Sequence, residues 1–257
     1  MIVCADDYGL HEDVDEAVLE LCEHGSLTAV SCLAVLQRCT GEAFRALQKH
    51  GAAVDIGLHL CLTDEGLPLE PRSMQTLPNF GSLLRRGWLK QLNPRDIAHE
   101  IQRQYDHFVA KSGRPPDHID GHLHVHQLPG IREGLLEFMS RLPASSRPYV
   151  RNTRMSIRDL RRLGLPWLKA GIIGALGKAM EVRLATAGIR TNRGFAGVYD
   201  FRKWTRYPEY FPRFTAALDK PNGILVVHPG LKEDWRKQEF ETLRRFAPND
   251  ARRNRFT

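Results

Sequence analysis

The sequence lacks the long apolar run that a membrane-spanning protein shows. No apolar stretch in its 257 residues approaches the roughly 20 residues that a transmembrane helix needs. A signal-peptide pattern is also missing, since the strand-like start at 1–5 turns acidic at once. We therefore expect no transmembrane segment and a cytoplasmic location.

Cysteine is scarce, and its spacing carries no redox or zinc motif. The chain has five cysteines and no Cys-x-x-Cys pair, and several of the five lie within apolar runs. We expect reduced, mostly buried thiols, as in a cytoplasmic protein. The five are Cys4, Cys22, Cys32, Cys39 and Cys61.

Positive charge is in excess, with a formal net charge of +7. Such an excess can indicate a nucleic-acid or membrane-surface partner. Here it is concentrated in 151–162 and in a polar tail from about 248, and no nucleic-acid module is visible. We expect no specific nucleic-acid partner, and interpret the arginines as solvated faces or as a patch for an anionic partner.

Strand and helix signals alternate along the chain. A hydrophobic content of 42% supplies a sizeable core, and repeated strand–helix units predict a parallel sheet. About seven such units predict an α/β fold, a distorted (β/α) TIM-like barrel formed by one domain over 1–257. The expected strands are 2–5, 29–36, 53–60, 117–120, 148–152 and 223–227. The expected helices are 12–23, 41–50 with Thr40 as N-cap, 94–111, 131–141, 156–187 with interruptions at Gly164, Pro166 and Gly171, 209–218 and 237–246.

The most informative stretch is the run from Asp117 to His126, which holds four of the eleven histidines. If it continues a strand, the alternation of side chains puts Asp120, His122, His124 and His126 on one face. Imidazole and carboxylate groups are the usual ligands of a catalytic divalent metal. The sequence therefore predicts metal chemistry, with a histidine-rich surface loop as the alternative.

Polar residues also follow other predicted strands. The pair Asp6-Asp7 follows the first strand, His59 ends the third, His122 follows the fourth, and His228 follows the last. In a (β/α) barrel the loops at the carboxyl ends of the strands build the active site. We therefore expect these four segments to converge.

Each of these residues has a simpler interpretation. The adjacent aspartates could cap the first helix or shape a turn. His59 could be a buried core histidine, and His228 could belong to the turn formed with Pro229 and Gly230. Arg151 could form a surface ion pair or belong to the site.

Four motifs in order carry a family resemblance: 5–10 (ADDYGL), 57–60 (GLHL), 118–126 (HIDGHLHVH) and 227–230 (VHPG). Together they resemble the YdjC-like carbohydrate deacetylase family, which includes chitooligosaccharide deacetylases. The resemblance implies a distorted (β/α) barrel that binds one divalent metal ion. Magnesium is favoured from the family, and zinc serves the related polysaccharide deacetylases. It also implies removal of acetyl groups from N-acetylated sugars.

Carried over position by position, the resemblance makes Asp7, His59 and His122 the metal ligands and Asp6 the general base. One departure is Gly121, which stands where many relatives have serine. This change removes a hydroxyl group near the metal but none of the ligands.

Further roles follow from the chemistry of amide hydrolysis. A leaving amine must be protonated, and His228 is the first candidate for the general acid, with His126 second. Asp120 and His124 are expected to orient the ligands, and Arg151 to hold Asp6 or contact the sugar.

Two other functions stay open. The first is another mononuclear metal hydrolase, a phosphoesterase or an amidohydrolase. The second is a non-catalytic sugar-binding barrel.

The substrate is expected to be an acetylated amino sugar, either a chitooligosaccharide or a glycolipid-linked sugar. The loop 62–92 and the segment 154–187 are expected to shape its groove. The mixed arginine-rich and apolar character of the second segment suits a lipid-linked substrate, a helix packed on the barrel, or a homodimer interface.

Overall fold

Parallel strands form the centre of the molecule. The structure, a computed structural model, describes residues 1–51, 53–63, 78–155, 167–218, 221–245 and 255–257. Within these residues seven strands pair in the order β5-β4-β3-β2-β1-β7-β6, and each pairing is parallel. The strands are β1 (Ile2–Tyr8), β2 (Ala29–Cys32), β3 (Asp55–Leu60), β4 (His118–Gly121), β5 (Tyr149–Val150), β6 (Gly194–Ala196) and β7 (Gly223–Val227).

The two ends of this sheet meet. Val150 of β5 forms an isolated parallel bridge with Thr191, which lies just before β6. The backbone N–H of Val150 donates to the carbonyl of Arg190 at 2.9 Å. Next to it, Asn152 and Asn192 exchange hydrogen bonds between side chain and backbone. The sheet therefore curls into a distorted (β/α) barrel, and the predicted fold class is confirmed.

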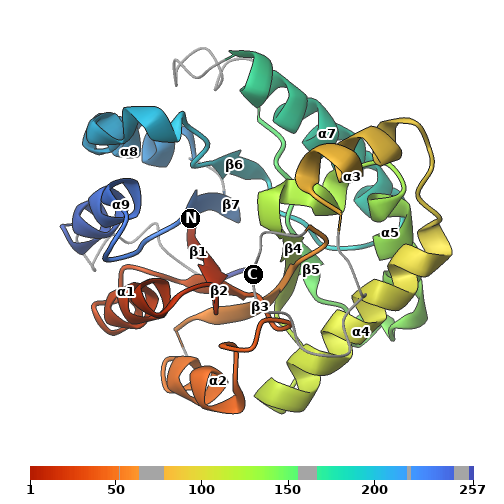
Figure 1. The fold of residues 1–257 in the computed structure, drawn as a ribbon, viewed down its shortest axis with the longest axis horizontal. Coiled ribbons are helices and arrows are strands. Elements are labelled where there is room, and N and C mark those ends of the chain that lie inside the picture. Colours follow the sequence, from red (N-terminus) through yellow and green to blue (C-terminus); the bar gives the residue numbers. More distant parts are fainter. Residues whose placement is uncertain (52, 64–77, 156–166, 219–220, 246–254) are drawn as a thin grey trace.

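Helices surround the curled sheet, as Figure 1 shows. The α-helices are α1 (Glu12–Glu23), α2 (Gly41–Gln48), α3 (Phe80–Trp88), α4 (Pro94–Ser112), α5 (Ile131–Arg141), α7 (Trp167–Thr186), α8 (Tyr207–Ala217) and α9 (Asp234–Arg244). Three short 3-10 segments are η1 (His122–Gln127), η2 (Ala144–Ser146) and η3 (Phe201–Arg206).

The strands are covered on both faces, because side chains fill the barrel inside and helices pack on it outside. All residues of β3 and of β7 are buried. The largest apolar cluster joins the strands to the inner faces of the helices, for example Leu21 of α1 and Phe108 of α4. Any charged side chain inside this barrel is therefore removed from water and needs a partner.

Several predicted element ends are confirmed. The bounds of α1, α5 and β7 agree with the expected ranges. The hydroxyl of Thr40 accepts a hydrogen bond from the backbone N–H of Ala43 and caps α2. Gly113 takes a left-handed φ of 73° and ends α4.

Other predicted bounds are wrong. The second strand stops at Cys32 instead of residue 36, because a turn with a hydrogen bond from Leu36 N–H to Leu33 O follows it. Helix α7 continues through Gly171, since one glycine costs only about 1 kcal/mol in a helix. Helix α3 lies where the sequence predicts a loop, and the three-residue β6 is too short to leave a pattern.

Parts of three predictions lie outside the described residues. These are the stretch 156–166 with Gly164 and Pro166, residues 64–77 of the loop 62–92, and the start of the polar tail at about 248. The single-domain assignment stays a prediction.

All five cysteines are free and buried, which confirms the expectation of unpaired core thiols. None of the helices in the described part of the chain combines the length and hydropathy that a membrane span requires.

Gly57 of β3 gives the clearest test of barrel packing. A Cβ at this position would lie 2.2 Å from the ring of His118, which is 1% exposed and stacks on Tyr149. We predict that Gly57→Ala lowers the free energy of unfolding by about 3 kcal/mol, because the ring has no room to withdraw. Urea unfolding followed by circular dichroism measures this change.

Gly171→Ala is the matched control. Nothing lies within 4 Å of a Cβ there, and the helical site favours alanine by up to about 1 kcal/mol. Equal unfolding midpoints for the two variants would contradict the packing described here.

Candidate functional site

Two neighbouring carboxylates lie at the carboxyl end of β1. Adjacent residues of a regular strand point to opposite faces, yet Asp6 and Asp7 both line the same cavity. The pairing of β1 with β2 shifts register between Ala5 and Tyr8, and Asp7 has a left-handed φ of 70°. This bulge brings both carboxylates to one side of the strand.

Two imidazoles converge on one oxygen of Asp7. Nδ1 of His122 lies 2.9 Å from Asp7 Oδ1, and Nε2 of His59 lies 3.5 Å from the same atom. One ligand atom from each of the three residues lies within 4.8 Å of the others. They come from β1, β3 and η1, so the barrel brings together the three residues that the sequence predicts as metal ligands.

The chemistry of these groups fits a divalent cation. Two ring nitrogens can approach one carboxylate oxygen only with protons or a cation between them. A carboxylate and two imidazoles are a common ligand set for catalytic divalent metals, with open positions for water and substrate. The second oxygen of Asp7 accepts a hydrogen bond from Arg236 at 2.9 Å, which leaves Oδ1 to the imidazoles.

The predicted strand at 117–120 corresponds to β4, but the histidine run does not continue it beyond Gly121, so the one-face arrangement that depended on such a strand is wrong. Residues 122–127 form η1, in which Leu123 and His124 have left-handed φ values of 53° and 58°. On one side β3 ends at Leu60, opposite Gly121, and on the other β5 has only two residues, so β4 has no partner strand along which to continue. The alternation of side chains therefore stops, and His122, His124 and His126 take three different environments.

Arg151 is fully buried and binds Asp6. Its two terminal nitrogens donate to the two carboxylate oxygens at 2.6 and 2.7 Å. Burial alone would raise the pKa of Asp6, but Arg151 and His59 together outweigh it and hold that pKa below its ordinary value. Asp6 is therefore ionised at neutral pH, and Arg151 is an interior residue rather than a surface ion pair.

Asp120 links this ion pair to His59. Its Oδ1 lies 2.6 Å from Nδ1 of His59, and its Oδ2 accepts from Arg151 and from the hydroxyl of Ser31. Burial lowers and Asp120 raises the pKa of His59, and the result is about 10. Asp120 thus fixes the ring so that Nε2 faces Asp7, which is the orienting role expected from the sequence.

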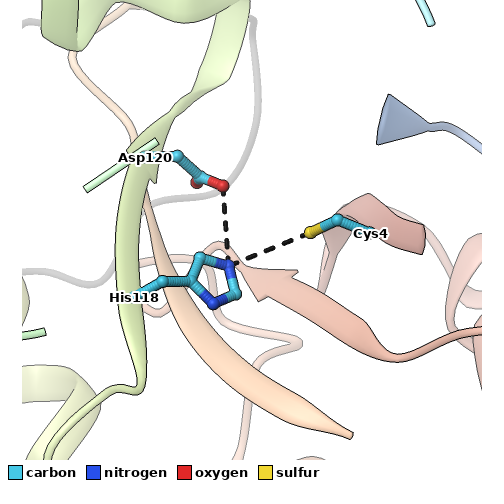
Figure 2. A group of neighbouring side chains, drawn as sticks. All are labelled: Cys4, His118 and Asp120. Carbon is cyan, nitrogen blue, oxygen red and sulfur yellow. Dashed lines mark hydrogen bonds and ion pairs between the residues drawn. The ribbon is translucent and has the colours of Figure 1, made fainter. Parts of the chain in front are cut away.

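A second cluster of possible ligands lies deeper in the barrel. Figure 2 shows Nε2 of His118 directed at Cys4 Sγ and Asp120 Oδ2, at 3.9 and 3.6 Å. However, Arg151 donates to Cys4 Sγ at 3.0 Å and also pairs with Asp120. Burial raises the pKa of the Cys4 thiol, so it stays protonated. A cation would meet a guanidinium there, and we interpret this cluster as support for Arg151.

Three further histidines were predicted near the site. His228 and His124 line the cavity, whereas His126 is fully buried and does not. Nε2 of His126 donates to the backbone carbonyl of Arg151 at 2.9 Å. Burial lowers the pKa of both His228 and His126 to about 4. Of the two candidates for the general acid, the structure brings only His228 to the cavity.

Helix α9 contributes two residues that the sequence interpretation missed. Arg236 is 5% exposed and binds Asp7, as described above. Glu239 accepts from the backbone N–H of His228 at 2.6 Å and from the hydroxyl of Tyr199 at 2.7 Å. Both lie on the helix face that buries Phe240 and Leu243. A charged residue within an apolar helical stripe is the signal that could have revealed them.

The site opens into one cavity of about 500 Å³. Asp6, Asp7 and His59 are at most 2% exposed and form its floor. Its rim includes Phe80, Leu123 and Ile172, which are 37–48% exposed. The cavity has the size and the mixed apolar and polar lining of a small-molecule site.

A family model described as YdjC-like protein matches residues 1–253. A chitooligosaccharide deacetylase of Yersinia enterocolitica is 38% identical over 138 residues, which are 51% of this chain and 52% of that protein. A carbohydrate deacetylase of Mus musculus is 29% identical over 227 residues, which are 70% of this chain and 72% of that protein. The chain thus spans about half the length of the bacterial relatives that it matches.

Solved structures with the same fold include the following one. It is an Enterococcus faecalis protein named for cellobiose-phosphate cleavage, with a TM-score of 0.65 and 20% identity. The match covers 95% of this chain and 89% of that one. At this identity the likeness shows the fold alone.

Glu239 yields a pH-dependent prediction. Burial raises its pKa from 4.5 to about 7, so the folded state holds this proton more tightly than the unfolded chain. Its contribution to stability is therefore greatest below pH 4.5 and falls as pH rises to about 7. Glutamine does not ionise, so the Glu239→Gln variant should not lose stability in this way as pH rises. The stability of the variant relative to wild type should rise by on the order of 3 kcal/mol between pH 4.5 and 8.

Urea unfolding across this pH range measures the difference. Glu241→Gln on the same helix is the control, and its difference from wild type should change little with pH. A flat difference for Glu239→Gln would show that the carboxyl titrates normally.

Proposed function

Because the chain belongs to the YdjC-like family, we propose that it is a metal-dependent hydrolase that removes the N-acetyl group from an acetylated amino sugar. One observation carries this proposal: Asp7, His59 and His122 converge on the floor of the cavity beside an ionised Asp6. Relatives named as chitooligosaccharide and carbohydrate deacetylases support the reaction class.

Asp7, His59 and His122 would hold one divalent ion. When bound, the ion polarises the acetamide carbonyl, lowers the pKa of the attacking water and stabilises the oxyanion. The family favours magnesium, and a set of two imidazoles and one carboxylate also suits zinc. Arg236 holds Asp7 and Asp120 holds His59, so both ligands are fixed before substrate arrives.

Asp6 would act as the general base. It lines the cavity next to the ligand Asp7, and its pairing with Arg151 keeps it ionised and fixed in position. It accepts the proton of the attacking water as the new C–O bond forms. The ion pair lowers the basicity of Asp6, so the proton transfer also requires the metal to lower the pKa of the attacking water.

His228 would protonate the leaving nitrogen. Its pKa of about 4 makes the imidazole neutral at neutral pH, so it stores no proton before the reaction. The proton removed from water therefore has to reach the amine through Asp6 and His228 as the C–N bond breaks. Glu239 positions the backbone of His228 for this step.

A phosphoesterase that uses two metal ions would need a second group of ligands beside the first. In the described part of the chain, each of the two other possible ligand groups includes Asp120. Each of these two groups also includes an atom that accepts a hydrogen bond from Arg151, Cys4 Sγ in one and a carboxylate oxygen of Asp6 in the other. The positive charge of Arg151 opposes a cation there. This favours a single ion and amide hydrolysis.

The first test is acetate release from N-acetylchitobiose. We expect protein stripped with EDTA to be inactive, and magnesium, zinc, manganese or cobalt to restore release. His59→Ala and His122→Ala should lose both bound metal, measured by elemental analysis, and more than about 100-fold of kcat/KM. His99→Ala, an exposed histidine on α4, should lose neither. Full activity in the metal-free protein would refute the metal-dependent mechanism.

Asp6→Asn separates metal binding from turnover. Asparagine cannot accept the proton, so kcat should fall about 10²- to 10⁴-fold while metal content stays near wild type. Circular dichroism checks that the variant folds despite the loss of charge beside Arg151. Unchanged kcat would remove Asp6 from the mechanism.

A further inference from the structure

The barrel closes through a seam with little strand pairing. Within the described residues, one isolated bridge joins Val150 of β5 to Thr191, which lies just before β6. The other neighbouring strands pair at two or more positions each. Backbone that is held by fewer hydrogen bonds opens at a lower free-energy cost. The seam is therefore where the barrel opens most readily, unless other contacts hold it closed.

Arg151, which holds the proposed general base, stands on this seam. The backbone N–H groups of Val150 and Asn152 both donate across the seam, at 2.9 and 2.7 Å. Arg151 lies between these two residues, so its backbone is held on both sides. Its guanidinium binds the carboxylate of Asp6. A displacement at the seam would therefore move the guanidinium relative to Asp6.

Residues 255–257 lie across the same seam, at the amino ends of the strands. The ring of Phe256 stacks on Tyr149, the first residue of β5, with centroids 4.0 Å apart and planes at 13°. The guanidinium carbon of Arg190, directly before the bridge at Thr191, lies 5.4 Å from the centre of the same ring. Phe256 thus contacts both sides of the seam, by aromatic stacking and by a cation–π contact.

The neighbours of Phe256 anchor the segment on both sides of the seam. Nε of Arg255 and the backbone N–H of Phe256 donate to the two oxygens of Asp55, at 2.5 and 3.0 Å. Asp55 is 3% exposed, so its charge needs a partner, and Arg255 supplies one. Thr257 exchanges hydrogen bonds with the side chain of Asn222, at 2.9 and 3.2 Å. Asp55 begins β3 on the β5 side, and Asn222 precedes β7 on the β6 side.

A line of contacts runs from this segment towards the site. In the view of Figure 1 the end of the segment, marked C, falls inside the ring of strands. Tyr149 stacks on His118 with centroids 5.1 Å apart, and Nε2 of His118 lies 2.9 Å from the hydroxyl of Ser31. That hydroxyl donates its one hydrogen to Asp120 at 2.6 Å, so Nε2 of His118 is the donor to Ser31. Phe256 is thus linked by successive contacts to the carboxylate of Asp120.

We propose that Phe256 is a positioning residue. Together with Arg255 and Thr257 it clamps the seam between β5 and β6 from the amino end of the barrel, and it thereby keeps Arg151 in contact with Asp6. The clamp acts from the end opposite to the cavity. Its effect on the seam is independent of the reaction, whereas its effect on turnover rests on the proposed deacetylase function.

Hydrogen exchange followed by NMR tests the clamp. In Phe256→Ala the amides of Val150 and Asn152 should exchange at least about tenfold faster than in wild type, relative to amides of β1 in the same variant. The reason is that loss of the ring opens the seam without unfolding the central strands. Phe256→Tyr keeps the stacked ring and should exchange like wild type.

Leu19→Ala on α1 is the matched control. It removes a partly buried apolar side chain from the main core, away from the seam. It should therefore accelerate exchange at the seam and in β1 by the same factor, through lower overall stability.

Acetate release reports on the position of Arg151. Phe256→Ala should lower kcat about tenfold and leave KM near its wild-type value, because a displaced Arg151 misplaces the general base. Phe256→Tyr and Leu19→Ala should keep the wild-type kcat. Arg255→Gln, which retains the ring, should shift the seam exchange and kcat in the same direction by a smaller factor, and it replaces Phe256→Ala if that variant does not fold.

The outcomes separate the clamp from the deacetylase function. Equal acceleration of seam and β1 amides in Phe256→Ala and Arg255→Gln would overturn the clamp. Faster exchange at the seam with unchanged kcat would overturn the positioning of Arg151. Absence of acetate release by the wild-type protein, with every substrate and metal, would refute the deacetylase function instead. The exchange rates would then decide the clamp by themselves.

Discussion

The pairing of buried Arg151 with Asp6 and Asp120 is the interaction on which the site depends. A guanidinium inside a barrel is tolerable only when its charge is matched, and here two carboxylates and the Ser31 hydroxyl surround it. The same contacts set the chemistry around it. Asp6 is held ionised at the cavity floor, and Asp120 is held where it orients His59. Removal of the guanidinium would leave buried Asp6 without its ion-pair partner and Asp120 with histidine partners alone, so folding and function share this one group.

The charge around Asp7 follows from that arrangement. Three carboxylates, Asp6, Asp7 and Asp120, are buried with two guanidiniums, those of Arg151 and Arg236. This leaves one negative charge unmatched. In the protein alone a proton on His59 neutralises it, because Asp120 raises the pKa of that imidazole to about 10. A bound cation would replace the proton. The site is therefore built with a deficit of positive charge at the point where the two imidazoles meet Asp7.

The sequence predicts the frame of this site better than its details. Asp6-Asp7, His59 and His122 could be placed together because parallel strands in a barrel end at the same rim, a consequence of topology. The turn of η1 could not be predicted, since it follows the point where both neighbouring strands, β3 and β5, have ended and uses left-handed residues that are not glycine. Arg236 and Glu239 were missed because α9 is rich in charged residues, and the stripe that marks its inner face has only two apolar members, Phe240 and Leu243.

The cavity has a polar floor and apolar walls, and this separation also follows from the order of the segments in the barrel. Its polar floor comes from strand ends and from the start of α9, which are held by Arg151 and Arg236, whereas its apolar walls come from α3, η1 and α7. The part that would carry out the reaction and the part that would select the substrate thus belong to different segments of the chain. Changes in α3 or α7 alter the walls without touching the ion pairs of the floor, so their effects on specificity and on catalysis should add nearly independently. Such a barrel can change what it binds while its chemistry stays fixed, because the buried charges of the site constrain the strands and α9 but not α3 or α7.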